Sequence, residues 1–87
     1  MDDEDAFYGN RGMEKYRKII AKNVRSARLA LKMSQEAFAD ESKIDRTYIS
    51  GIERGVRNPS LDMIVKIAIN LNVTPAALLT ETDKDQL

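Results

Sequence analysis

Several residue types that usually carry chemistry are missing from this sequence. It has no cysteine, so it forms no disulfide and offers no thiolate. It has no histidine either, so general acid–base catalysis lacks its usual side chain and a metal site would depend on carboxylates alone. Carboxylates are numerous, but none is paired on an expected buried face. We therefore predict no enzyme activity, no bound metal and no cofactor.

Long apolar runs are missing as well. No stretch approaches the roughly 20 apolar residues of a membrane-spanning helix, and no basic start followed by an apolar segment suggests a signal peptide. We expect a cytoplasmic protein that does not contact a membrane. With 87 residues the chain is expected to form one domain. A domain of this size buries a modest core and gains stability from dimerisation.

The net charge of zero conceals an uneven distribution. Residues 1–12 and 80–87 are acidic, whereas residues 13–79 hold twelve Lys and Arg against seven Asp and Glu, a net charge of +5. A basic body suits a polyanionic partner, although a solvated mixed-charge surface would give the same count. The chain is expected to consist of an acidic, flexible N-terminal segment (1–12), a folded body (13–79) and a polar tail (80–87).

The apolar spacing predicts an all-α fold with helices over residues 13–32, 35–42, 46–54, 61–71 and 75–79. Each of the last four helices follows a residue that can cap it: Ser34, Asp45, Ser60 and Thr74. Gly55 is expected to end the third helix in a left-handed conformation. In the fourth helix, the predicted buried stripe is Leu61, Ile64, Ile67 or Ala68, and Leu71.

The stretch 34–57, SQEAFADESKIDRTYISGIERGVR, organises the rest of the chain. Two short helices are joined by a tight turn, and the second buries Ile49 and Ile52 on one face. This arrangement is the helix-turn-helix unit, whose second helix enters a DNA major groove. Gly51 has two open interpretations, because mid-helix glycine costs about 1 kcal/mol relative to alanine. Either the backbone must approach DNA closely there, or the glycine is merely tolerated.

Three segments carry a resemblance to a known family: MSQEAFADES, IDRTYISGIERGVRNPSLDMIVKIA and LNVTPAALL. Over about residues 19–79 the chain resembles the Cro/C1-type (xenobiotic-response-element) helix-turn-helix domain. The part RTYISGIERGVRNPS is most similar to the controller proteins of restriction–modification systems, which are small dimeric regulators that bind operators near their own genes. The resemblance implies a compact five-helix, lambda-repressor-like DNA-binding domain. Lys32 and Lys43 stand where family members often have glycine, so positive φ is expected at both.

The resemblance also implies roles for single residues. Four residues at the start of the third helix would read bases: Arg46, Thr47, Tyr48 and Ser50. Four others would contact phosphates: Gln35, Arg54, Arg57 and Asn58. Two match a structural ion pair between the first and third helices: Arg28 and Glu53. Two acidic residues on one exposed helix face match positions at which activating members contact RNA polymerase, although a solvated face is the simpler interpretation: Glu36 and Asp40.

The C-terminal region has more apolar residues than a small core absorbs. The surplus set, called here the C-terminal apolar set, is Ile69, Val73, Ala76, Ala77, Leu78 and Leu79. A contiguous exposed apolar patch marks an interaction site, so we predict an isologous homodimer with the fifth helix at its axis. Alternatively, the two leucines complete the core of the monomer.

These observations predict a sequence-specific, double-stranded DNA-binding transcriptional regulator that acts as a homodimer on palindromic operators. Two alternatives stay open: the DNA-binding antitoxin of a toxin–antitoxin pair, and a protein-interaction module that retains the fold without binding DNA. The expected partners are operator DNA, a second copy of the chain and RNA polymerase. Both repression and activation are open roles for such a regulator.

Overall fold

The structure is a computed structural model that describes the backbone of residues 3–82 and the side chains of residues 12–82. This part of the chain contains no strand and the following helices: α1 (Asp3–Ala30), α2 (Gln35–Ser42), α3 (Arg46–Glu53), α4 (Leu61–Leu71) and α5 (Pro75–Leu78). The predicted all-α fold is confirmed. Most of the polar tail expected over 80–87 lies outside the described residues.

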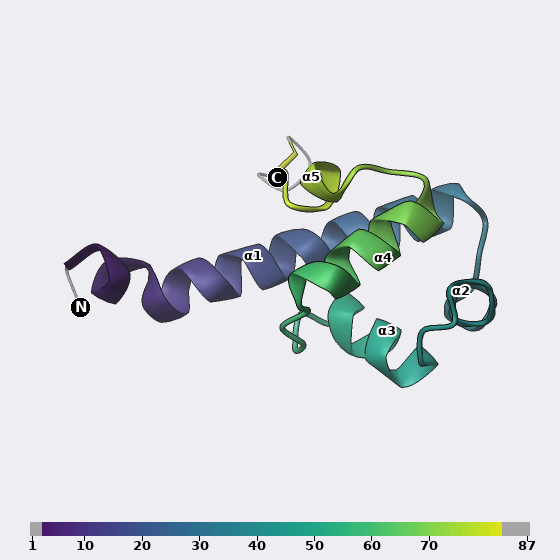
Figure 1. Ribbon diagram of the computed structural model, residues 1–87, viewed down its shortest axis with the longest axis horizontal. Helices are drawn as coiled ribbons and strands as arrows, with labels where there is room; N and C mark the ends of the chain where they lie inside the picture. The colour runs from purple at the N-terminus through teal and green to yellow at the C-terminus, as the bar shows by residue number, and fades with distance from the viewer. Residues whose placement is uncertain (1–2, 83–87) are drawn as a thin grey trace.

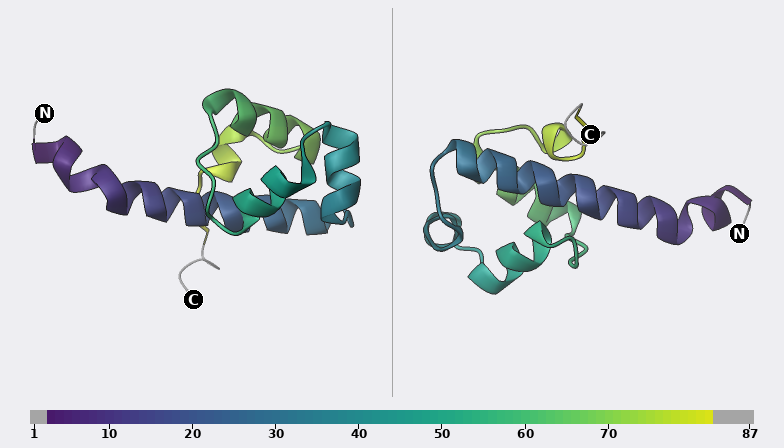
Figure 2. Two further views of the ribbon diagram at one scale, coloured as in Figure 1. Left: turned by 90° about the horizontal axis from the view of Figure 1, so that it is seen from below. Right: turned by 180° about the vertical axis from the view of Figure 1, so that it is seen from behind.

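Helix α1 starts much earlier than its apolar pattern indicates. It begins at Asp3, whereas the pattern places its start at Met13 or Glu14. The N-terminal part of α1 extends beyond the other helices (Figures 1 and 2). A helical segment that projects in this way needs no apolar stripe, so the periodicity that locates the rest of α1 carries no signal there. The predicted start was therefore wrong, and the helix includes the backbone of residues 3–12.

Side-chain caps begin the four shorter helices as predicted. Their oxygens accept first-turn backbone N–H groups at 2.8–3.3 Å, and the capping residues are Ser34, Asp45, Ser60 and Thr74. Each cap satisfies a donor that has no partner inside its helix. The caps therefore set where α2, α3, α4 and α5 begin, and this explains why their starts follow from local sequence.

Left-handed residues follow four of the helices. Lys32 (φ 59°), Lys43 (φ 61°) and Gly55 (φ 75°) confirm the predicted positive φ values, and Asn72 (φ 60°) follows α4. A left-handed residue at this position turns the chain back along the helix that it has just left. These turns keep the connections short, so successive helices pack against one another.

A single core joins all five helices. Its buried members are Ile20, Val24, Phe38, Ile44, Ile49, Ile52, Ile64, Ile67, Ala68, Leu71 and Leu78. Leu61 was wrongly predicted to belong to it, because 70% of its surface is exposed. Leu61 is the first residue of α4, and the buried face of that helix starts one turn later at Ile64.

Helices α1 and α4 pack together in the middle of the molecule, and the remaining helices lie on two sides of them. Helix α5 packs on both α1 and α4. Helices α2 and α3 lie on the opposite side from α5 in Figure 1 and in the right-hand view of Figure 2. The helix-turn-helix unit and the C-terminal helix therefore occupy separate surfaces of one small body.

Candidate nucleic-acid interface

Helix α3 presents one face to the core and the other to solvent. Ile49 and Ile52 are each 1% exposed. Arg46 and Thr47 are exposed at its first two positions, whereas Tyr48 and Ser50 are half-buried. Because Asp45 caps the helix through the N–H groups of Thr47 and Tyr48, its start is rigidly defined. The four predicted base-reading residues thus lie together on the first turns of one short helix.

Arg46 also has an acidic neighbour across the turn. Its Nε lies 4.0 Å from Glu36 Oε1, and the side chains of the two residues are 59% and 78% exposed. An exposed pair of this kind contributes at most about 1 kcal/mol. Its importance is positional, since Glu36 reaches the predicted base-reading surface, whereas Asp40 lies one turn further along α2. The two acidic residues predicted to contact polymerase therefore have different surroundings.

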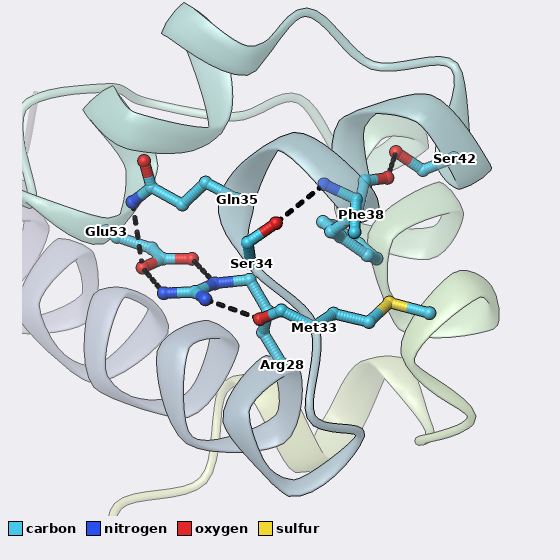
Figure 3. A network of polar contacts seen from close by, with 8 residues as sticks. Arg28, Met33, Ser34, Gln35, Phe38, Ser42 and Glu53 are labelled. Atoms are coloured by element: carbon cyan, nitrogen blue, oxygen red, sulfur yellow. Dashed lines mark hydrogen bonds and ion pairs between the residues drawn. The ribbon is translucent and has the colours of Figure 1, made fainter.

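Arg28 and Glu53 form the expected pair between α1 and α3 (Figure 3). The contact is bidentate, with Arg28 Nε 2.7 Å from Glu53 Oε2 and Nη2 2.8 Å from Oε1. The side chains are 8% and 4% exposed. Arg28 Nη1 also donates to the carbonyl oxygen of Met33 at 2.7 Å. This geometry holds the last turn of α3 against α1 and against the end of the loop before α2.

The electrostatic state of this pair is simple. The hydrogen bond to Glu53 raises the pKa of the Arg28 guanidinium above its ordinary value, against a smaller opposing effect of burial. A raised folded-state pKa stabilises the fold at every pH below the ordinary value for arginine and loses that effect only above it. The Arg28 side of the pair therefore stays charged across the working pH range and provides no pH switch.

Gln35 extends this network to the first residue of α2 (Figure 3). Its Nε2 donates to Glu53 Oε1 at 3.2 Å, so one of its two amide hydrogens is engaged. Sequence reasoning identified Gln35 as a phosphate contact and missed this bond, because the two residues are separated along the chain and no local pattern pairs them. The bond fixes the orientation of Gln35 between α2 and α3.

The loop after α3 contains the other predicted phosphate contacts. Arg54, Arg57 and Asn58 are all exposed. The guanidinium carbon of Arg57 lies 5.4 Å from the centroid of the Tyr48 ring. Tyr48 and Arg57 were assigned separate roles from the sequence, yet they are neighbours in space. The loop therefore lies beside α3, so Arg57 and Tyr48 can contact the same ligand.

The C-terminal apolar set divides into two groups. Leu78 is 1% exposed, so it belongs to the core of the monomer and not to the predicted interface. Val73 is partly buried and packs against the same core. Ile69 and Leu79 are 65% and 37% exposed. Ala76 and Ala77 are also exposed. The exposed members come from α4 and from α5 with its C-cap.

Asn23 is a further positioning residue that sequence reasoning missed. Its Nδ2 lies within hydrogen-bonding distance of three carbonyl oxygens, those of Ala77 (3.2 Å), Leu78 (2.8 Å) and Thr80 (3.0 Å). The carbonyls of Ala77 and Leu78 end α5, and that of Thr80 follows the C-cap residue Leu79. Asn23 thus ties α5 to α1. A polar residue between Ile20 and Val24 on α1 was the available signal, but it does not identify the partner.

Two other features, a metal site and a membrane-spanning helix, are absent from the described residues. No group of three or more acidic, histidine or cysteine side chains could hold a metal ion in this part of the chain. Among the same residues, every helix is too short or too polar to cross a membrane.

The fold and the site together match one family. The helix-turn-helix family model, HTH_3, matches residues 24–78, so the chain belongs to the helix-turn-helix family. Within that family it is similar to control protein C.BamHI of Bacillus amyloliquefaciens. The two are 51% identical over 67 residues, which is 76% of this chain and 83% of that protein.

Solved structures agree with this family assignment. The hypothetical transcription factor NHTF from Neisseria matches with a TM-score of 0.76 at 35% identity, over 84% of this chain and 85% of that one. The restriction–modification controller protein C.Esp1396I, a tetramer in complex with its natural 35 base-pair operator, matches with a TM-score of 0.66 at 35% identity. This match covers 72% of this chain and 83% of the other. The resemblance to controller proteins read from the sequence is confirmed.

Proposed function

We propose that this protein is a sequence-specific regulator of transcription that binds double-stranded operator DNA as a homodimer and controls a restriction–modification system. One observation carries the proposal: α3 is capped, anchored to α1 by a buried bidentate ion pair, and exposes Arg46 and Thr47 at its start. Arginine pairs with guanine O6 and N7, and the threonine methyl group contacts thymine. Relatives named as controllers, one of them in complex with its operator, support the same function.

Phosphate contacts supply the affinity in this proposal, and base contacts supply the specificity. Gln35 sits at the first residue of α2, beside the end of α3, where a helix N-terminus favours phosphate. The exposed cations Arg54 and Arg57 follow α3, and Arg57 lies beside Tyr48. Phosphate contacts at Gln35 and at the loop after α3 would hold the two DNA strands that border a major groove, with α3 inside that groove. A protein-interaction module without DNA binding has no comparable reason to keep both cations and Gln35 around α3.

The decisive experiment is selection of bound sequences from random double-stranded DNA. We expect enrichment of a symmetric site with half-sites about 34 Å apart, because two copies of α3 must enter successive major grooves on one side of the duplex. Affinity should fall steeply as salt rises, because counterions are released from phosphates. A chain that enriches no sequence, even at low salt, would rule out the proposal.

Activation is a finer part of the proposal. We infer that Asp40 of α2 contacts RNA polymerase, with Glu36 contributing from the edge of the DNA surface. Asp40 is exposed, and unlike Glu36 it has no ion pair among those found in the described residues. Asp40→Asn should keep operator occupancy and reduce activated transcription several-fold in a reporter assay with footprinting. Transcription that follows occupancy alone would show that Asp40 is simply solvated.

Two further statements follow from this function. We propose that the protein catalyses no reaction, because every residue assigned a role either binds DNA, a second chain or polymerase, or holds the helices together. We also propose that it acts in the cytoplasm, where bacterial operators are found. Assays for nuclease or methyltransferase activity with the purified chain should therefore give no turnover, and detected turnover would contradict the first statement.

A further inference from the structure

Gly51 lies inside α3, where a glycine weakens the helix and needs a reason. The residue is buried. A Cβ at this position would lie 2.7 Å from Arg57 Cγ, 3.1 Å from Arg57 Nε and 3.4 Å from Arg57 Cδ. The three nearest atoms all belong to one side chain. The space left by the missing Cβ is therefore occupied by the stem of Arg57.

The end of α3 explains how Arg57 reaches this position. The N–H of Val56 donates to the carbonyl of Gly51 at 3.0 Å, and the N–H of Gly55 donates to that of Ile52 at 3.0 Å. With Gly55 at φ 75°, these two bonds form a Schellman motif. The motif turns the chain back along the helix, so Arg57 returns over a residue six positions before it.

The far end of Arg57 reaches Tyr48. The guanidinium carbon lies 5.4 Å from the centre of the Tyr48 ring, which is a cation–π distance. Tyr48 and Gly51 are three residues apart on α3 and therefore share a face. Arg57 thus lies along the surface of α3, with its stem on Gly51 and its charge beside Tyr48, about one turn earlier in the helix.

We infer that Gly51 is a positioning residue for Arg57. The absence of a Cβ lets Arg57 lie across α3 and holds its guanidinium at the edge of the surface formed by Arg46 and Thr47. A cation that is already ordered loses less conformational freedom when DNA binds. The inference rests on the proposed DNA-binding function. It also replaces both earlier interpretations of Gly51: the glycine makes room for a side chain of the same protein.

The test is a double-mutant cycle measured on the full chain with operator DNA. Gly51→Ala should keep or raise the melting temperature, because alanine favours the helix, yet weaken operator binding about tenfold. Arg57→Ala should weaken binding by at least as much. The double variant should bind no more weakly than Arg57→Ala, because there is then no Arg57 to displace. Gly12→Ala, the same change inside α1, is the matched control and should leave binding unchanged.

A spectroscopic measurement separates positioning from a general effect on the fold. In the free protein, the Arg57 side-chain protons near the Tyr48 ring should show ring-current shifts in NMR spectra. These shifts should be lost in Gly51→Ala and retained in Gly12→Ala. If Gly51→Ala fails to fold, the double variant, which removes the crowding, is compared with Arg57→Ala, and equal binding is expected.

Different negative results would contradict the proposed DNA-binding function and the role of Gly51. Wild-type protein that selects no DNA overturns the proposed function and this inference with it. If wild-type protein binds but Gly51→Ala weakens binding equally with and without Arg57, the inference alone is overturned, since the glycine then acts through the backbone. Unchanged binding of Gly51→Ala together with lost ring-current shifts overturns it too, because the pose of Arg57 would not matter.

Discussion

Arg46 occupies the first position of α3, exposed and within 4.0 Å of Glu36. If it reads a base, Arg46→Ala should reduce the preference for operator over random DNA by about 1–3 kcal/mol at one base pair, because a bidentate contact is lost. Weak nonspecific binding should persist, because phosphate contacts supply most of it. Competition titrations with operator and mutated operator measure the difference. An unchanged preference would remove Arg46 from the readout.

Arg28 and Glu53, unlike Arg46, are expected to affect the stability of the fold rather than the recognition of DNA. Truncating either partner leaves a buried charge unpaired, which typically costs about 3–5 kcal/mol. We expect Arg28→Ala and Glu53→Ala to be strongly destabilising and far from additive in chemical denaturation. Lys15→Ala, which removes an exposed partner 3.6 Å from Glu81, is the control and should change stability by less than about 1 kcal/mol. Additive effects of the two truncations would mean that the pair contributes little as a unit.

Side-chain pairs could be anticipated from the sequence only where a resemblance supplied them. The Arg28–Glu53 pair came from the family pattern, and its contact is confirmed. The bond from Gln35 to Glu53 and the packing of Arg57 on Gly51 depend on how α2 and the loop after α3 pack against α3. Neither periodicity nor composition predicts these two contacts, because each joins residues that have no regular spacing along the chain.

The starts of α2, α3, α4 and α5 were predicted correctly from the sequence, whereas the start of α1, and therefore its length, was not. The caps at Ser34, Asp45, Ser60 and Thr74 were found from residue type alone, because the capping bond is local. The differences at the ends of α3 and α5 are one residue, which is the usual uncertainty of a helix boundary. The start of α1 was missed because the apolar pattern from which this helix was predicted does not extend over residues 3–12.

Lys43 offers a test at this scale. It follows α2 in a left-handed conformation with φ 61° and ψ 30°, which costs a residue with a Cβ about 1–2 kcal/mol. Lys43→Gly should remove this strain, partly offset by the greater freedom of glycine in the unfolded chain. We expect a net gain of up to about 1 kcal/mol, a rise in melting temperature of about 4–8 °C. Thermal unfolding followed by circular dichroism measures it.

The control for that prediction is Lys66→Gly. Lys66 is exposed in the middle of α4, where glycine has no strain to relieve and should destabilise the protein by about 1 kcal/mol. If both variants lose stability, the left-handed conformation of Lys43 imposes no measurable cost.

The predicted homodimer depends on the exposed members of the C-terminal apolar set. Leu79, at the C-cap of α5, is 37% exposed, and Ile69 of α4 is 65% exposed. If they form the dimer interface, Leu79→Glu should produce a monomer, because two carboxylates would face each other across the two-fold axis. Operator affinity should then fall steeply, since the half-sites bind independently. Sedimentation velocity at micromolar concentration, with and without operator DNA, measures both.

Leu29→Glu is the matched control for the dimer. Leu29 is 52% exposed on α1, so it receives the same change of charge outside the C-terminal apolar set and should remain dimeric. A wild-type chain that stays monomeric even on operator DNA would exclude the predicted interface. A Leu79→Glu variant that still dimerises would move the interface to another surface.

The left-handed positions at Lys32 and Lys43 came from the resemblance to a family, whereas local patterns were sufficient for the helix-turn-helix unit, the caps and the left-handed Gly55. These features depend on residues a few positions apart, whose conformational preferences act wherever the segment is placed. The core membership of Leu78, the exposure of Leu61, the bond from Gln35 to Glu53 and the seat of Arg57 on Gly51 were decided by tertiary structure. Each depends on which distant surfaces meet when α1 and α4 pack, and burial is a property of that packing rather than of a residue's own hydrophobicity.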